Sequence, residues 1–126
     1  MDGIATEQTA KPLPRCVLIV EDNGLLAMNM QEMLHELGIE EILLGTSVAE
    51  TLPFLDAGGI DFAILDFDLG RETSAPIAER LRAARVPFIF ASGYGDGVSL
   101  PPELVGAPIL QKPYMMRDIE AAIASV

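Results

Sequence analysis

The chain has 126 residues, half of them apolar, which fits one domain with a single core. Its net charge of −11 disfavours direct binding to nucleic acid or to an anionic membrane surface, and its longest apolar runs are far shorter than the roughly 20 residues that span a bilayer. One cysteine, Cys16, excludes an internal disulfide, and residues 1–14 lack the apolar core of a signal peptide, so we expect a cytosolic protein.

The start of the chain is polar and carries Pro12 and Pro14, which discourage regular structure. We therefore expect residues 1–14 to be a flexible leader and residues 15–126 to form the folded domain.

Five short apolar runs alternate with helical patterns through that domain. The strands are expected at Cys16–Val20, Glu41–Gly45 and residues 61–66, 87–92 and 108–111. These runs are apolar throughout instead of alternating, which is typical of strands buried on both faces. The sequence therefore predicts an α/β fold, a doubly wound, five-stranded parallel sheet with helices on both faces.

Helices are expected between the strands. The first should bury a stripe of Leu26, Met30, Met33 and Leu37 and stop at Gly38. Others are expected near residues 48–56, after Thr73 and Ser74 with Pro76 in the first turn, and along a final stripe of Met116, Ile119 and Ile123. The segment from Gly93 to Gly106 is rich in glycine and proline, so the fourth helix should be short or mobile.

Chemically active residues stand where the predicted strands end. Glu21 and Asp22 follow the first strand, Asp66 ends the third, Ser92 ends the fourth and Lys112 follows the fifth. In parallel sheets these ends meet at one edge, where sites form. Carboxylates there suit Mg²⁺, and a lysine can pair with a phosphoryl oxygen, so the pattern favours a phosphate-handling magnesium site.

Each of these residues has a simpler interpretation. Asp66 as a nucleophile competes with a turn or capping aspartate, and Glu21 and Asp22 compete with ordinary loop acids. Asp68 can offer its backbone carbonyl to the same Mg²⁺. Lys112 is one of two lysines, and the other lies in the leader. A phosphate-handling magnesium site is favoured by the order in which five such residues follow the strands, namely Glu21, Asp22, Asp66, Ser92 and Lys112.

In that order the pattern resembles the response-regulator receiver domain of two-component signalling, from about Arg15 to Val126. The resemblance implies a flavodoxin-like (βα)5 fold and phosphorylation of Asp66 by a histidine kinase or a histidine phosphotransfer protein. It also implies catalytic roles for Ser92 and Lys112. Magnesium would be held by Glu21, Asp22, Asp66 and the carbonyl of Asp68.

Residues 87–95, with the sequence PFIFASGYG, and residues 66–70 also resemble the stand-alone subgroup of FAT GUY regulators. The subgroup usually has threonine where this chain has Ser92, which keeps the hydroxyl. The wider family has an aromatic switch residue where this chain has Ile109, so the usual ring rotation is absent there. Tyr94 is our candidate for that switching role.

We expect no effector domain after Val126 and therefore expect output through binding of another protein. The expected surface is the segment from Gly93 to Gly106 together with the last helix, because phosphorylation adds charge beside that segment. By analogy with the subgroup, the pathway would be bacterial stress signalling.

Two alternatives remain from the sequence. Asp66 and Asp68 also resemble the aspartate pair of haloacid-dehalogenase-type phosphatases, although that pair normally lies on the first strand and in longer chains. Turnover of a small phosphate ester would favour this enzyme. The other alternative is a pseudo-receiver that binds partners without phosphate, which negligible Mg²⁺ binding would favour.

Overall fold

The computed structural model describes residues 13–92, 108–111 and 114–125. Five strands form one parallel sheet: β1 (Cys16–Val20), β2 (Glu41–Gly45), β3 (Phe62–Asp66), β4 (Phe88–Ser92) and β5 (Ile109–Gln111). Their order in space is β2-β1-β3-β4-β5, the arrangement of flavodoxin-like folds, whose sites lie where the strand order reverses. The predicted sheet is confirmed.

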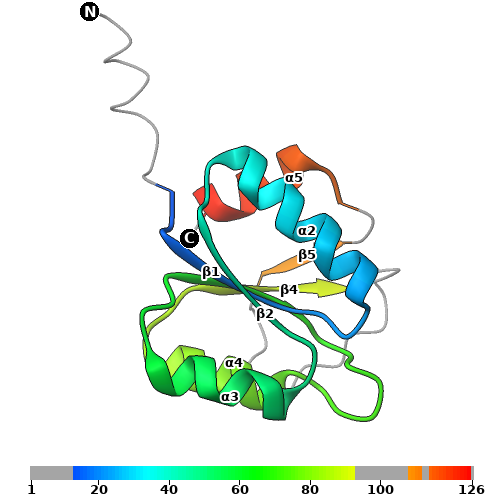
Figure 1. The fold of residues 1–126 in the computed structure, drawn as a ribbon, viewed down its shortest axis with the longest axis vertical. Coiled ribbons are helices and arrows are strands. Elements are labelled where there is room, and N and C mark those ends of the chain that lie inside the picture. Colours follow the sequence, from blue (N-terminus) through cyan, green and yellow to red (C-terminus); the bar gives the residue numbers. More distant parts are fainter. Residues whose placement is uncertain (1–12, 93–107, 112–113, 126) are drawn as a thin grey trace, which may run out of the picture.

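Four helices lie in the described part of the chain: α2 (Gly24–Leu37), α3 (Val48–Ala57), α4 (Ala75–Ala83) and α5 (Met116–Ala124). Figure 1 shows α2 and α5 on one face of the sheet and α3 and α4 on the other. Helices on both faces were predicted and are confirmed. The expected leader up to Pro12 and the expected short fourth helix fall outside the described residues.

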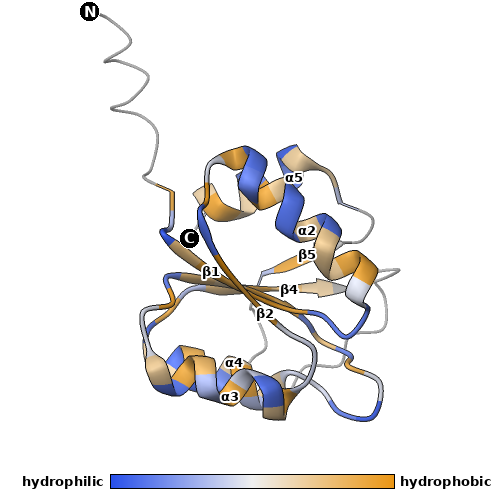
Figure 2. Ribbon diagram, in the orientation of Figure 1, coloured by the Kyte–Doolittle hydropathy of each residue, from blue (hydrophilic) through white to orange (hydrophobic). Residues whose placement is uncertain are grey.

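The strands are apolar along their length, and Figure 2 shows them between the two helical layers. Side chains that alternate along each strand enter two separate cores. The core under α3 and α4 contains Leu18, Val20, Leu65, Ile77, Leu81 and Phe90. The core under α2 and α5 contains Ile19, Met30, Leu34, Ile64, Ile89 and Ile119.

The buried stripe of α2 differs from the expected one. Ala27, Met30 and Leu34 are buried, whereas Leu26 is 39% exposed and Met33 is only partly buried. The small Ala27 faces the sheet, and Leu26 lies about 100° further round the helix, which turns it outward. The predicted stripe was therefore wrong by one helical position at its start.

Local sequence signals account for both ends of α2. The Asn23 side chain caps α2 by accepting from the backbone N–H groups of Leu25 and Leu26, at 3.0 and 3.2 Å. Gly38 ends the same helix with φ of 106°, a conformation that favours glycine.

Within the described residues no helix has both the length and the apolar character to cross a membrane.

Candidate functional site

Three carboxylates meet at the carboxyl edge of the sheet. Glu21 and Asp22 directly follow β1, and Asp66 ends β3, its parallel neighbour. One carboxylate oxygen from each lies within 4.8 Å of the others. Glu21 is buried, Asp66 is half-buried and Asp22 is exposed, so the cluster opens to solvent on one side. The convergence predicted for these three residues is confirmed.

Glu21 is held in place from both sides. Its backbone N–H donates to the Gly45 carbonyl at the end of β2, at 3.0 Å. Its Oε2 accepts from the backbone N–H of Asn23, at 3.2 Å, where α2 begins. A carboxylate at a helix N-terminus is favoured by the helix dipole. The buried acid is therefore anchored by the neighbouring strand and by the first turn of α2.

The end of β2 packs directly on α3. Thr51, on α3, is fully buried and donates its hydroxyl to the Ser47 carbonyl at 2.8 Å. A Cβ atom built on Gly45 would collide with the Thr51 Oγ1. Only glycine allows this approach, so Gly45 fixes the position of the carbonyl that holds Glu21.

The loop after β3 is closed by its own hydrogen bonds. The Asp68 Oδ1 accepts from the Gly70 N–H at 2.9 Å, and the Leu69 N–H donates to the Glu72 carbonyl at 2.9 Å. Gly70 has φ of 90°, and a Cβ there would lie 3.7 Å from the Asp22 Oδ2. The loop is thus folded back against the acidic cluster.

Asp68 stands apart from the other acids. Its exposed carboxylate is engaged in the turn to Gly70 and does not belong to the group whose oxygens lie within 4.8 Å of one another. The role predicted for its backbone carbonyl stays a prediction.

The same loop is tied to α3. The Glu72 Oε2 accepts from the Val48 N–H at 2.9 Å, so a carboxylate from the β3–α4 loop caps the first turn of α3. Sequence reasoning gave no role to Glu72, because its partner is 24 positions away along the chain.

Tyr114 is a further residue of the site that sequence reasoning missed. It follows β5 and packs against the core under α2 and α5. Burial, together with the negative charges of Glu21 and Asp66, raises the pKa of its phenol. The available signal was an aromatic residue two positions after Lys112, at the same edge as the acids.

Other predicted residues are not placed relative to the cluster. Ser92 ends β4, paired with Gln111, but its side chain lies outside the described part of the chain, as do Tyr94 and Lys112. Ile109 lies on the edge strand β5 and is 46% exposed. This aliphatic side chain occupies the position at which the receiver family usually has its aromatic switch residue.

The donor set suits a hard cation. The cluster consists of three carboxylates and contains no imidazole or thiolate, and carboxylate oxygens are the ligands that Mg²⁺ prefers. A bound cation would also relieve the repulsion between the three negative charges. Within the described residues this is the one group of at least three potential ligands with metal-site spacing. His35 is exposed on α2 and is not part of it.

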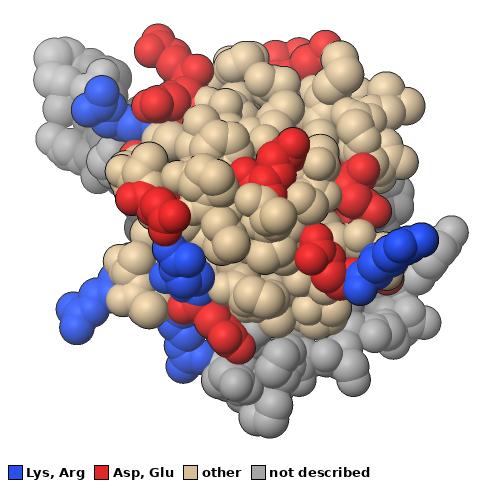
Figure 3. Space-filling model, turned by 60° about the horizontal axis from the view of Figure 1, so that its bottom comes forward, with Lys and Arg blue, Asp and Glu red and all other residues tan. Residues whose placement is uncertain are grey.

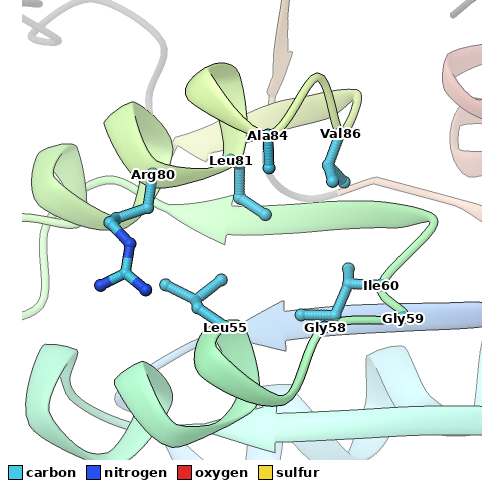
Figure 4. A pocket seen from close by; sticks show the side chains of 8 residues that line it. All are labelled: Leu55, Gly58, Gly59, Ile60, Arg80, Leu81, Ala84 and Val86. Atoms are coloured by element: carbon cyan, nitrogen blue, oxygen red, sulfur yellow. The ribbon is translucent and has the colours of Figure 1, made fainter.

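A separate pocket lies at the opposite end of the sheet. It has a volume of about 340 Å³ and lies between the ends of α3 and α4, lined mainly by apolar side chains such as Leu55, Ile60 and Leu81 (Figure 4). Ile60 precedes β3 and Asp66 ends it, which separates the two places by roughly 20 Å at about 3.3 Å per residue. The pocket is not part of the acidic site.

Figure 3 shows the molecule turned so that the bottom of Figure 1 comes forward. On this face, acidic and basic side chains are scattered among uncharged ones. The described residues visible there offer no continuous basic surface of the kind that binds nucleic acid.

Comparison with known proteins supports the fold and the family. No protein-family model matches the chain. The solution structure of SdrG from Sphingomonas melonis Fr1 is 38% identical with a TM-score of 0.79, over 91% of this chain and 98% of SdrG. A BeF3-activated conformation of SdrG is also similar, with a TM-score of 0.74.

More distant proteins are also similar to this chain. A response regulator receiver domain protein from Clostridium thermocellum is 22% identical with a TM-score of 0.73, over 87% of this chain and 91% of that one. The transcriptional regulatory protein PdtaR of Mycobacterium tuberculosis is 28% identical over 126 residues, 98% of this chain. The chain spans 61% of the length of PdtaR. Sheet order, acidic cluster and these similarities together show that the chain belongs to the CheY-like receiver domains of response regulators.

Proposed function

We propose that this protein is a single-domain response regulator that accepts a phosphoryl group on Asp66 in a Mg²⁺-dependent reaction. The donor would be a histidine kinase or a histidine phosphotransfer protein, and the output would be phosphorylation-dependent binding to another protein. The observation that carries the proposal is the convergence of Glu21, Asp22 and Asp66 within 4.8 Å, in a domain of this family.

Asp66 is the acceptor in this proposal because it ends the central strand and remains half-exposed. A carboxylate oxygen of Asp66 attacks phosphorus, and the bond from phosphorus to the donor nitrogen breaks, with its electron pair returning to the imidazole. Neighbouring Glu21 is buried and Asp22 lies on the exposed side, so both flank the acceptor without blocking it.

Magnesium fits the donor set, and Glu21, Asp22 and Asp66, with the carbonyl of Asp68, would hold it. Bound Mg²⁺ would offset the negative charge of the carboxylates and the incoming phosphoryl oxygens. The Ser92 hydroxyl is proposed to hydrogen-bond to the phosphoryl oxygens, and the Lys112 ammonium to neutralise their charge. Both roles are supported by the places of these residues in the chain, since Ser92 ends β4 and Lys112 directly follows β5.

A protein donor is supported by the surface next to the cluster. The first turns of α2 expose Leu25 at 68% and Met28 at 56%, a short distance along the chain from Asp22. Exposed large apolar side chains gathered beside a site are typical of protein-binding surfaces. We propose that the phosphodonor docks over this end of α2.

For the output surface we retain the segment from Gly93 to Gly106 together with α5. The motif at residues 87–95 supports a FAT GUY-type regulator, and by that analogy a role in bacterial stress signalling in the cytosol. SdrG is similar in sequence and has a BeF3-activated conformation, which supports activation of this chain by the same phosphoryl mimic.

The phosphatase alternative gains no support, because Asp66 lies on the third strand along the chain, not on the first. The phosphate-independent alternative is tested by the same experiment as the proposal.

The test is intact-mass spectrometry after incubation with acetyl phosphate, with Mg²⁺ or with EDTA. We expect one phosphoryl adduct in the wild type, dependent on Mg²⁺ and absent from Asp66→Asn. The matched control is Asp61→Asn, an exposed aspartate just before the same strand, which should be phosphorylated normally. No adduct in the wild type, or an adduct that persists in Asp66→Asn, would overturn the proposal.

A further inference from the structure

The pocket between the ends of α3 and α4 has a buried floor and an open rim. Its volume is about 340 Å³, at the small end of the usual range for ligand pockets, roughly 300–1,000 Å³. Ile60 and Leu81 line it and are buried, Leu55 and Val86 are partly buried, and Ala84 is exposed. A small apolar group can therefore enter a cavity that is already formed.

One wall of the pocket carries no side chain. Gly58 and Gly59 line it with φ of 76° and 86°, a conformation that strongly favours glycine. A Cβ atom on either residue would meet no other atom within 4 Å, so the backbone conformation, and not crowding, requires glycine here. The wall leaves the pocket open, and its two amides can report on a bound molecule.

Among the described residues that line the pocket, Arg80 alone carries a charge. Figure 4 shows it at one end of the row of apolar side chains. Its Nη2 donates to the Asp56 Oδ1 at 2.7 Å, and the two side chains are 47% and 70% exposed. An exposed ion pair of this kind contributes little to stability, and one hydrogen bond occupies only one of the five N–H donors of a guanidinium. A ligand carboxylate can therefore pair with Arg80 in place of Asp56 or beside it.

The charges on the α4 side of the pocket favour an anion. Residues 79–86 carry three arginines, Arg80, Arg82 and Arg85, against one acid, Glu79. The arginines more than offset the partial negative charge at the carboxyl end of that helix. Asp61, which follows Ile60, accepts from the Cys16 N–H at 3.1 Å and is thereby held against β1. In a chain with a net charge of −11, this local basic excess distinguishes the pocket.

We propose that this pocket is a binding site for a small carboxylic acid with an apolar body. The apolar body is buried against Leu55, Ile60 and Leu81, which drives binding. The carboxylate accepts hydrogen bonds from Arg80, whose planar fork matches its two oxygens, and so the acid is selected over an uncharged analogue. The site lies at the opposite end of the sheet from the acidic cluster, and nothing in it depends on phosphorylation of Asp66.

The experiment titrates hydrocinnamate into the full chain and follows the backbone-amide NMR shifts, including those of the two glycines in the wall. Hydrocinnamate carries a phenyl ring and one carboxylate, and hydrocinnamyl alcohol is its uncharged counterpart. The variants are Arg80→Gln, which removes the charge, Asp56→Asn, which removes the competing carboxylate, and Ala84→Phe, which fills the pocket. Arg82→Gln is the matched control, an exposed arginine on the same helix that does not line the pocket. Urea unfolding of each variant checks that the fold is retained.

We expect saturable shifts confined to the pocket, with a Kd on the order of millimolar for so small a probe. Arg80→Gln should weaken binding about fivefold and Asp56→Asn should tighten it about threefold, because the two side chains compete for the same partner. Arg82→Gln should change the Kd by less than about twofold, since its charge acts only through solvent. Ala84→Phe should abolish binding.

No saturable shift in the wild type at well above the expected Kd would overturn this inference, as would shifts that persist in a folded Ala84→Phe protein. Equal losses in Arg80→Gln and Arg82→Gln would also overturn it, since the lining arginine would have no particular role. Equal binding of the alcohol would overturn the assignment of a carboxylate and indicate an uncharged occupant, such as an apolar side chain of a partner protein. All of these results leave the proposed function standing, which phosphorylation of Asp66 tests separately.

Discussion

Replacing Gly45 by alanine should destabilise the domain far more than a glycine-to-alanine change usually does. The new Cβ would collide with the Thr51 Oγ1 and lie 3.2 Å from the Thr51 Cβ. Thr51 is fully buried and its hydroxyl is bonded to the Ser47 carbonyl, so it has no free direction in which to turn without losing that bond.

The magnitude follows from these two contacts. Overpacking a tight core costs about 1–3 kcal/mol, and loss of the Thr51 hydrogen bond adds about 1 kcal/mol. The free energy of unfolding should therefore fall by roughly 2–4 kcal/mol. At about 4 °C per kcal/mol for a domain of this size, Tm should drop by roughly 8–16 °C.

Urea unfolding of Gly45→Ala, Thr51→Ala and the double variant measures the effect. Thr51→Ala removes the colliding oxygen, so Gly45→Ala should cost less than about 1 kcal/mol in that background, a coupling of at least about 1 kcal/mol. Gly24→Ala is the matched control, because a Cβ there meets no atom within 4 Å. A Gly45→Ala protein within about 0.5 kcal/mol of the wild type, or strictly additive costs, would refute this reasoning.

Three further predictions concern a helix cap, a surface ion pair and two titratable groups. Glu72→Ala removes the cap on α3 and should lower the free energy of unfolding by about 0.5–1 kcal/mol in urea; no change would mean that water replaces this cap without cost. Arg80→Ala breaks a 2.7 Å ion pair with Asp56 between two exposed side chains, so its cost should stay under about 1 kcal/mol and shrink with added salt; a larger, salt-independent cost would contradict this. The pKa values of Cys16 and Tyr114 are raised in the folded state, mainly by burial, so these groups ionise first in the unfolded chain, at about pH 8.5 and 10. The stability that these neutral groups contribute is therefore complete at neutral pH and is lost as pH rises through that range toward the folded pKa values. The free energy of unfolding, measured by urea unfolding between pH 7 and 10.5, should fall as pH rises, and a value that stays constant would contradict this.

The arrangement of strands was predictable from sequence because each strand is a short, uninterrupted apolar run between helical patterns. Parallel strands buried on both faces have few alternatives, and their carboxyl ends necessarily share an edge. For this reason the meeting of Glu21, Asp22 and Asp66 followed from their places at strand ends alone.

Details that depend on packing in three dimensions were not predictable. The outward turn of Leu26 depends on which side of α2 approaches the sheet, and the small Ala27 decides that. The requirement for glycine at position 45 comes from the approach of Thr51 on the following helix, which no local pattern encodes. The reach of Glu72 to α3 likewise depends on how two loops meet.

Tyr114 was missed for a different reason. An aromatic residue after a strand usually only packs against the core, and no local pattern around Tyr114 distinguishes it from such a residue. What separates it from an ordinary core residue is the effect of the Glu21 and Asp66 charges, which together with burial raise the pKa of its phenol.

The most direct test of the central claim is to locate the phosphoryl group. Borohydride reduces an aspartyl phosphate to homoserine and leaves free carboxylates unchanged, so peptide mass spectrometry after phosphorylation with Mg²⁺ and reduction identifies the acceptor. The account predicts homoserine at position 66 and at no other aspartate. Homoserine at Asp22 or Asp68, or phosphate retained on His35, would contradict it.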